Sequence, residues 1–290
     1  MVTQPPLDRE AELDALEDRV REALQRAEKA GAGAAEAQAQ LSRGLSVNVR
    51  MGEVETLEHM QDRGISVTVL IGRRKGQASS ADLRPETIAA CVDRALDIAR
   101  YTEEDPCNGL ADPDRLAVGA PDLDLWHPSP MDAEAAIERA LACEAAGRAE
   151  PRISNSEGAA FNAGLGLSVY GNSNGFVGRS SGTNYSQSCV LLAGRGDGMQ
   201  RDYSYDSRRC LADLEPVEVT GAEAARRTVG RLGARPLPTR AVPVLFAPRV
   251  ATGLISHLLR AISGSTLIRN ASFLKDRAGE QILPDWFRVA

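Results

Sequence analysis

Two different periodicities of apolar residues follow each other in the first hundred residues, and together they constrain the fold more than any other feature. Apolar residues recur every three to four positions over 8–29 and again over 85–99, which predicts two amphipathic helices. Between them, residues 45–71 alternate apolar and polar side chains, interrupted by glycines. Alternation is typical of half-buried strands, so we expect a three-stranded antiparallel meander over 45–51, 54–60 and 65–71.

A loop and a third helix complete the first half of the chain. Residues 102–128 are rich in Pro, Asp and Gly, which indicates a connecting loop. The sequence Ser-Pro-Met-Asp at 129–132 predicts a helix start with Ser129 as the cap, and Gly147 predicts its end. The order helix, meander, helix, loop, helix predicts an α+β fold, with an N-terminal domain over residues 1–150.

From about residue 151 the pattern changes to short apolar segments separated by Gly, Asn and Ser. These segments predict a series of antiparallel strands joined by tight turns. The sequence Thr-Gly-Ala-Glu at 220–223 resembles a capping box and predicts a helix. Residues 241–246 predict a buried strand, and residues 249–262 predict another amphipathic helix. We therefore expect a second, mainly antiparallel β-domain with helices over residues 151–290.

Charge and composition restrict the classes of partner. The chain has 34 Lys and Arg against 40 Asp and Glu, a net charge of −6, and its tight basic cluster at 73–75 lies at a predicted hairpin tip. A nucleic-acid surface needs basic residues gathered on one face, so we expect no nucleic-acid partner. Apolar runs are far shorter than a membrane span needs, and the N-terminus lacks the pattern of a signal peptide. We therefore expect a cytoplasmic protein without a membrane segment.

The cysteines predict no disulfide framework. There are five, widely spaced and without a C-x-x-C pair, at positions 91, 107, 143, 189 and 210. An odd number with this spacing favours neither disulfides nor a zinc knuckle. We expect reduced thiols, with Cys91, Cys143 and Cys189 buried as small apolar residues.

Three histidines are the candidate metal ligands, and none lies within a helical turn of another: His59, His127 and His257. His257 lies on a predicted helix directly after an apolar strand. A zinc peptidase would place a glutamate beside this histidine and a second histidine about one turn later. The neighbour here is Leu258, and Ile262 lies where a second ligand would be expected. The helix position is therefore present, but the chemistry of a zinc site is absent.

Two further patterns are interpreted as structural. Gly171–Gly175 matches the G-x-S-x-G pattern of serine hydrolases, but more strand follows it instead of a helix, so we interpret it as a hairpin turn. Tyr203 and Tyr205 share one face of a predicted strand. Sheet packing is favoured over a base-stacking platform, because few basic residues flank them.

Several segments resemble the TldD/TldE (PmbA) family of metallopeptidases. The segments NSEGAAFN, VYGNSNGF and GMQRDY, at 155–162, 169–176 and 198–203, resemble the family as a whole. The segments VATGLISHLLRAISG and LPDW, at 250–264 and 283–286, resemble its TldE/PmbA branch. The resemblance implies a cytoplasmic metallopeptidase system that trims or degrades small unfolded peptides. The family label "modulator of DNA gyrase" implies no DNA binding in a chain this acidic.

The resemblance also implies a division of labour between two subunits. In this family, TldD carries H-E-x-x-x-H on a helix after a buried strand and binds zinc. Laid onto this chain, His257 takes the first histidine position, Leu258 replaces the glutamate and Ile262 replaces the second histidine. Leucine cannot accept a proton and isoleucine has no lone pair for a metal. We therefore expect no cofactor and no catalytic residue in this chain, and a TldD-like partner that supplies the zinc in a heterodimer.

Two expectations complete the interpretation. The family continues past residue 290 with more sheet, so we expect the chain to lack part of its second domain. The alternative function, from a different class, is a non-catalytic scaffold or binding protein that acts without any peptidase.

Overall fold

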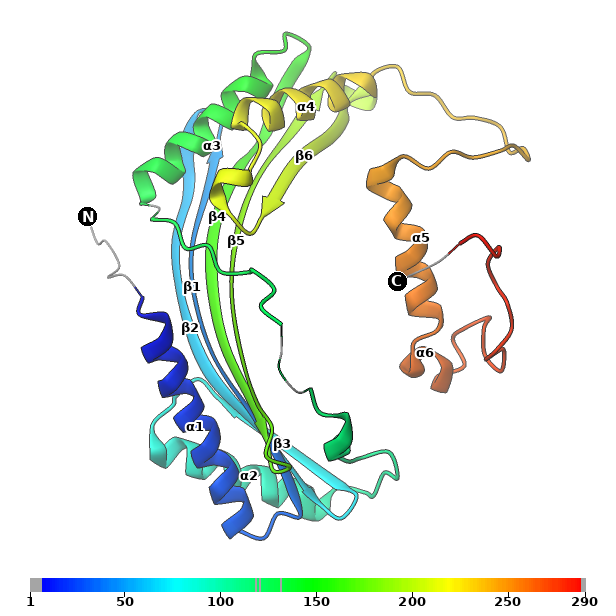
Figure 1. The fold of residues 1–290 in the computed structure, drawn as a ribbon. Helices are drawn as coiled ribbons and strands as arrows, with labels where there is room; N and C mark the ends of the chain where they lie inside the picture. The colour runs from blue at the N-terminus through cyan, green and yellow to red at the C-terminus, as the bar shows by residue number, and fades with distance from the viewer. Residues whose placement is uncertain (1–6, 118, 120, 131, 288–290) are drawn as a thin grey trace. The chain divides into compact units, whose positions relative to one another are not determined.

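The computed structural model describes residues 7–287 except 118, 120 and 131, and it contains two compact units, Met1–Ala234 and Arg235–Ala290. The first unit holds a six-stranded antiparallel sheet in the order β3-β2-β1-β4-β5-β6, together with helices α1 to α4 (Figure 1). The second unit holds helices α5 and α6. The fold is α+β, as expected.

The elements have the following bounds. The helices are α1 Arg9–Lys29, α2 Pro85–Tyr101, α3 Ala133–Arg148, α4 Val217–Gly230, α5 Pro248–Ala261 and α6 Gly264–Ile268. The strands are β1 Ala34–Arg50, β2 Glu53–Ile71, β3 Arg74–Ser80, β4 Ile153–Asn172, β5 Val177–Ala193 and β6 Gln200–Arg208. Short 3₁₀ turns lie at Pro113–Arg115, Gly196–Gly198 and Leu211–Asp213. None of the helices in the described ranges is long and apolar enough to cross a membrane.

The helices predicted from periodicity are confirmed. The two helices predicted from capping signals, α3 and α4, are also present, but neither begins at the predicted cap. Helix α3 begins after Asp132, whose Oδ1 accepts the N–H of Ala135 at 2.8 Å, and not after Ser129. The N–H of Ser129 donates instead to the hydroxyl of Tyr185. Helix α4 begins at Val217, so the predicted cap Thr220 lies inside it. The Thr220 hydroxyl is buried and bonded to other elements, and it is therefore not available to cap a helix.

The predicted meander is present with different strands. Strand β2 runs unbroken from Glu53 to Ile71 through Gly64, so two predicted strands are one, and β3 is the third strand. The turn between β1 and β2 lies at Met51 and Gly52, which both have positive φ (54° and 86°). In the same way, the predicted short strands after residue 151 are two long ones, β4 and β5. Glycines inside them pair in register and do not form turns.

Residues on both sides of position 150 share one sheet. We expected a domain boundary there, but β4 pairs with β1 from Glu36↔Asn172 to Val49↔Ala159. The first compact unit therefore continues to Ala234. Residues 241–246, expected to form a buried strand, are exposed and irregular. A strand needs a neighbouring strand for its hydrogen bonds, and the described part of the second unit contains none.

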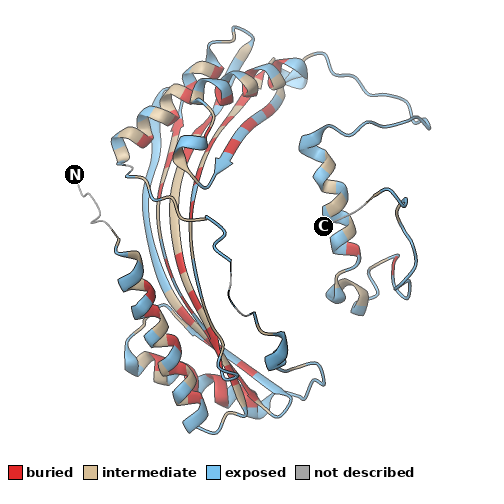
Figure 2. Cartoon of the chain, in the orientation of Figure 1, coloured by how far each residue is buried: buried red, intermediate tan, exposed pale blue. Residues whose placement is uncertain are grey.

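Helices α1 to α4 all pack against one face of the sheet and form two cores (Figures 1 and 2). Helices α1 and α2 cover residues such as Leu41 and Val67, and α3 covers residues such as Val47 and Phe161 together with α4. In β1, β4 and β5 the residues of these cores are odd-numbered. The opposite face therefore carries the even-numbered side chains of these strands and the odd-numbered ones of β6. We call it the open face, since no helix covers it in the described residues of this unit.

Candidate functional site

The three positions singled out from the sequence lie on or beside helix α5. His257 and Ile262 are exposed and Leu258 is half-buried. His59 lies on β2 and His127 in the loop before α3, both in the first unit, whereas His257 belongs to the second. Among the residues that the structure describes, no three His, Cys, Asp or Glu side chains could together hold a metal ion. A single imidazole does not fit a zinc site, which takes three or four protein ligands.

The G-x-S-x-G segment is a hairpin turn, as expected. Strand β4 ends at Asn172 and β5 begins at Val177. The side chain of Asn172 accepts the N–H of Asn174 at 3.0 Å, and the Ser173 hydroxyl accepts the N–H of Ala35 at 3.0 Å. The serine therefore ties the turn to β1.

The buried thiols are structural. Cys91, Cys143 and Cys189 are buried, and no disulfide links the cysteines that the structure describes. A hydrogen bond with Cys143, together with burial, raises the pKa of Cys189, and burial raises the pKa of Cys91. A raised pKa keeps a thiol protonated and unreactive.

A pocket of about 760 Å³ lies between the loop at 127–129, helix α3 and the start of α4. Its polar groups bind other parts of the protein. Arg139 donates to Gln187 at 3.2 Å and its guanidinium lies over the ring of Phe161, 5.3 Å from the centroid. The Glu215 carboxylate accepts a hydrogen bond from the Thr220 hydroxyl at 2.7 Å. These contacts hold α3, β5 and α4 together.

Tyr203 and Tyr205 differ from the expectation of sheet packing. They lie on the open face and are 43% and 63% exposed, and their rings stack on each other with centroids 6.2 Å apart. β6 is an edge strand without a helix on that face, so the rings contact each other and solvent.

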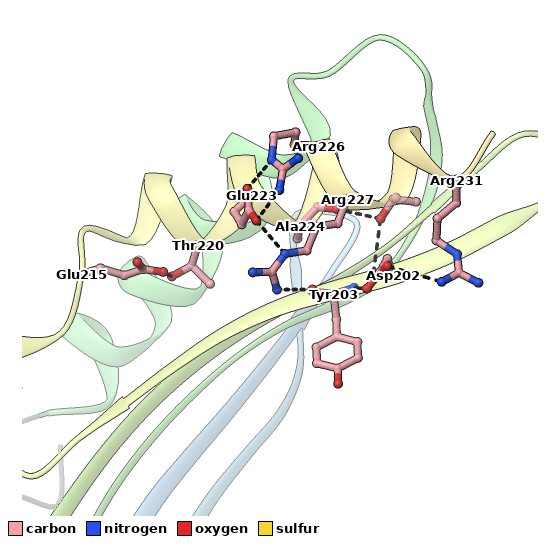
Figure 3. A network of polar contacts seen from close by, with 10 residues as sticks. Asp202, Tyr203, Glu215, Thr220, Glu223, Ala224, Arg226, Arg227 and Arg231 are labelled. Carbon is pink, nitrogen blue, oxygen red and sulfur yellow. Dashed lines mark hydrogen bonds and ion pairs between the residues drawn. The ribbon is translucent and has the colours of Figure 1, made fainter. Parts of the chain in front are cut away.

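Helix α4 caps the edge strand β6 (Figure 3). Arg227 donates to the carbonyl oxygen of Tyr203 at 3.1 Å, and the Asp202 carboxylate accepts the N–H of Tyr203 at 2.8 Å. Glu223 binds both Arg226 and Arg227 at 2.6 Å. The hydrogen bond from Arg226 is the main reason why the pKa of Glu223 is lowered to about 2. Side chains therefore satisfy the main chain of Tyr203 at this edge, which hinders pairing with another strand there.

Comparison with known proteins identifies the family. Three sequence models of PmbA/TldA metallopeptidases match in order: domain 1 over residues 35–99, the central domain over 126–232 and the C-terminal domain over 239–290. The chain belongs to the PmbA/TldD metallopeptidase family. The boundary between the first two of these models falls in the loop before α3 and not at position 150.

Curated relatives agree with this assignment. The metalloprotease PmbA of Escherichia coli O157:H7 is 47% identical over 97% of this chain and 62% of its own length. The metalloprotease PmbA homologue of Haemophilus influenzae is 44% identical over 92% of this chain and 59% of its own length. The chain therefore spans about three fifths of the PmbA relatives that it resembles.

Solved structures share the fold. A Bacteroides thetaiotaomicron protein, named as a candidate modulator of DNA gyrase, matches with a TM-score of 0.84 and 26% identity over 91% of this chain and 60% of its own. TldE from Thermococcus kodakarensis matches with a TM-score of 0.73 and 21% identity over 92% of this chain and 59% of its own. The family resemblance predicted from the PmbA/TldD segments is thus confirmed.

Proposed function

We propose that this chain is a TldE/PmbA-type subunit of a cytoplasmic TldD/TldE metallopeptidase that cleaves small unfolded peptides. In this proposal a TldD-like subunit binds the catalytic zinc, and this chain binds none. The observation that carries the proposal is the combination of PmbA family membership with a helix α5 on which Leu258 and Ile262 stand beside His257 where a zinc peptidase would carry a glutamate and a second histidine.

The residues around His257 support this assignment of zinc binding to the partner subunit. Hydrolysis by a zinc peptidase requires several metal ligands and a group that takes a proton from the attacking water. Leu258 and Ile262 offer neither function, and His257 is exposed and belongs to no group of three metal-binding side chains among the described residues. The role left to this chain is to bind the substrate and present it to the partner.

The test compares the isolated chain with the chain co-purified with a TldD-like subunit. We expect cleavage of casein only in the presence of the partner, loss of cleavage with a chelator, and zinc that depends on the partner's ligand histidines. Stoichiometric zinc and casein cleavage by the isolated chain would contradict the proposal. Binding of a protein target without cleavage in either preparation would favour the non-catalytic scaffold instead.

A further inference from the structure

A groove of about 570 Å³ crosses the middle of the open face, on strands β1, β4 and β5. Its floor is made of glycines from these three neighbouring strands. In the sheet register, Gly44 pairs with Gly164, and Gly166 pairs with Gly182. The side chain of Met60, opposite Gly44 on β2, and the side chain of Arg209 flank the groove.

Packing does not require two of these glycines. A Cβ added to Gly164 would meet its nearest atoms at 3.9 Å, and one added to Gly166 at 4.0 Å, which are ordinary contacts. Glycine inside a strand costs conformational entropy and often marks a place where another backbone approaches closely. The bare main chain at Gly164 and Gly166 therefore fits the close approach of a flat group.

Amide and hydroxyl side chains and few charged residues line the groove. Asn162 on its wall accepts from the Ser46 hydroxyl at 2.7 Å, and Ser168 accepts from Gln38 at 3.0 Å. Two charged residues are among its lining residues. The Arg43 side chain points to the helix-covered face, 3.8 Å from Glu12 of α1, and Arg209 donates to the Thr183 carbonyl at 3.1 Å. Amides and hydroxyls match the donors and acceptors of a peptide main chain.

We propose that this glycine-floored groove binds an extended segment of the unfolded peptide substrate, with the peptide main chain lying over Gly164 and Gly166. The inference rests on the proposed function and assigns its substrate-binding surface. Binding by main-chain groups makes recognition independent of side-chain charge. A nucleic acid is disfavoured, because its phosphates would need several lysines or arginines here.

The first test fills the groove without disturbing the fold. Gly166→Val introduces a β-branched side chain, which suits a strand, at a position where a Cβ makes only an ordinary contact at 4.0 Å. The matched control is Ala160→Val, on the same strand and face but outside the groove. The probe is fluorescein-labelled β-casein, titrated with the full chain and followed by fluorescence anisotropy.

We expect Gly166→Val to weaken casein binding at least tenfold, Ala160→Val to change it less than twofold, and both to keep the wild-type Tm. Gly166→Ala, which adds one methyl group, should give a smaller loss and keeps the test open if the valine variant unfolds. Wild-type affinity in both Gly166 variants would overturn the inference. A lower Tm with unchanged affinity in the alanine variant would do so too, by showing that the glycine serves the curvature of the sheet.

Two further measurements distinguish a failure of the groove inference from a failure of the proposed function. Displacement of casein by a single-stranded oligonucleotide would overturn the peptide assignment in favour of nucleic acid. If the complex with a TldD-like subunit cleaves casein and Gly166→Val leaves its KM unchanged, the groove inference fails while the proposed function stands. If the wild-type complex cleaves nothing, the proposed function fails. Casein binding to the isolated chain and its Gly166 variants still tests whether the groove binds peptide.

Discussion

Glu144 joins helix α3 to a turn that lies 93 residues earlier in the sequence. Its carboxylate is buried and accepts the N–H groups of Met51 and Gly52, each at 2.8 Å. Both turn residues have positive φ, so their amides have no partners in a regular ladder and depend on this side chain. Glu144 thus fixes the position of the β1–β2 turn against helix α3, which belongs to the core formed with α4.

Glu144→Gln should destabilise the protein. The amide that replaces one oxygen would place a donor against a buried N–H, which costs about 1 to 3 kcal/mol. Denaturant unfolding followed by circular dichroism measures this loss. Glu138→Gln, at an exposed position of the same helix, should change the free energy of unfolding by less than about 0.5 kcal/mol. Equal effects of the two variants would contradict the role assigned to Glu144.

His257→Ala should leave the complex unchanged. The imidazole is exposed and no group of metal-binding side chains surrounds it in the part of the chain that the structure describes. We expect casein cleavage within twofold of wild type when the variant is paired with a TldD-like subunit, and the same zinc content. A loss of zinc from the variant complex would show that His257 is a ligand.

At the scale of elements, glycines have two different roles. A Cβ at Gly76 of β3 would lie 2.0 Å from the Ala95 carbonyl oxygen of α2, so this glycine lets helix and strand touch. Overpacking of this kind costs about 1 to 3 kcal/mol. We expect Gly76→Ala to lower the Tm clearly, while Gly166→Ala does not. Thermal unfolding of the two variants in parallel checks this contrast.

The cap of β6 by α4 should depend on pH through Glu223. A carboxyl whose pKa is lowered in the folded state stabilises the fold above its unfolded value and loses that effect as the pH falls. For Glu223 this window extends from about 4.5 down to about 2. Because the ion pairs are partly exposed, we expect Glu223→Gln to cost less than about 1 kcal/mol at pH 7. The difference from wild type should shrink below pH 4.5 in denaturant titrations, and a constant difference would contradict this assignment.

At the scale of the whole molecule, the two compact units differ in how much apolar surface they bury. Among its described residues, the second unit buries two apolar side chains, Ala261 and Leu274. The segment at 235–247 is irregular and mostly exposed, and it contains Arg235 and Arg240. Segments with few buried contacts open locally before the core does.

Limited trypsin digestion should therefore cut first after Arg240, because the Arg235–Pro236 bond resists trypsin, and leave a fragment that ends at Arg240 and keeps the Tm of the intact first unit. Mass spectrometry of the early products and thermal unfolding of the fragment measure this. Early cleavage within the strands of the first unit would contradict the division into two units.

The sequence by itself determined helices α1 to α5, the hairpin turn at Asn172–Gly175 and the family. Periodicity and turn residues are local signals, and a buried helix face or a tight turn shows directly in the spacing of its residues. The same applies to Leu258 and Ile262, whose chemistry follows from residue type alone.

Only the tertiary structure decided the lengths of the strands, the helix caps and the open face. Gly64 suggested a break, but the neighbouring strand continues the ladder through it, since Gly64 pairs with Gln40 of β1, and a local pattern does not contain that partner. Thr220 lost its predicted capping role because Gln187 of β5 binds its hydroxyl. Which face of the sheet remains uncovered depends on where four separate helices pack, and no local pattern contains that information.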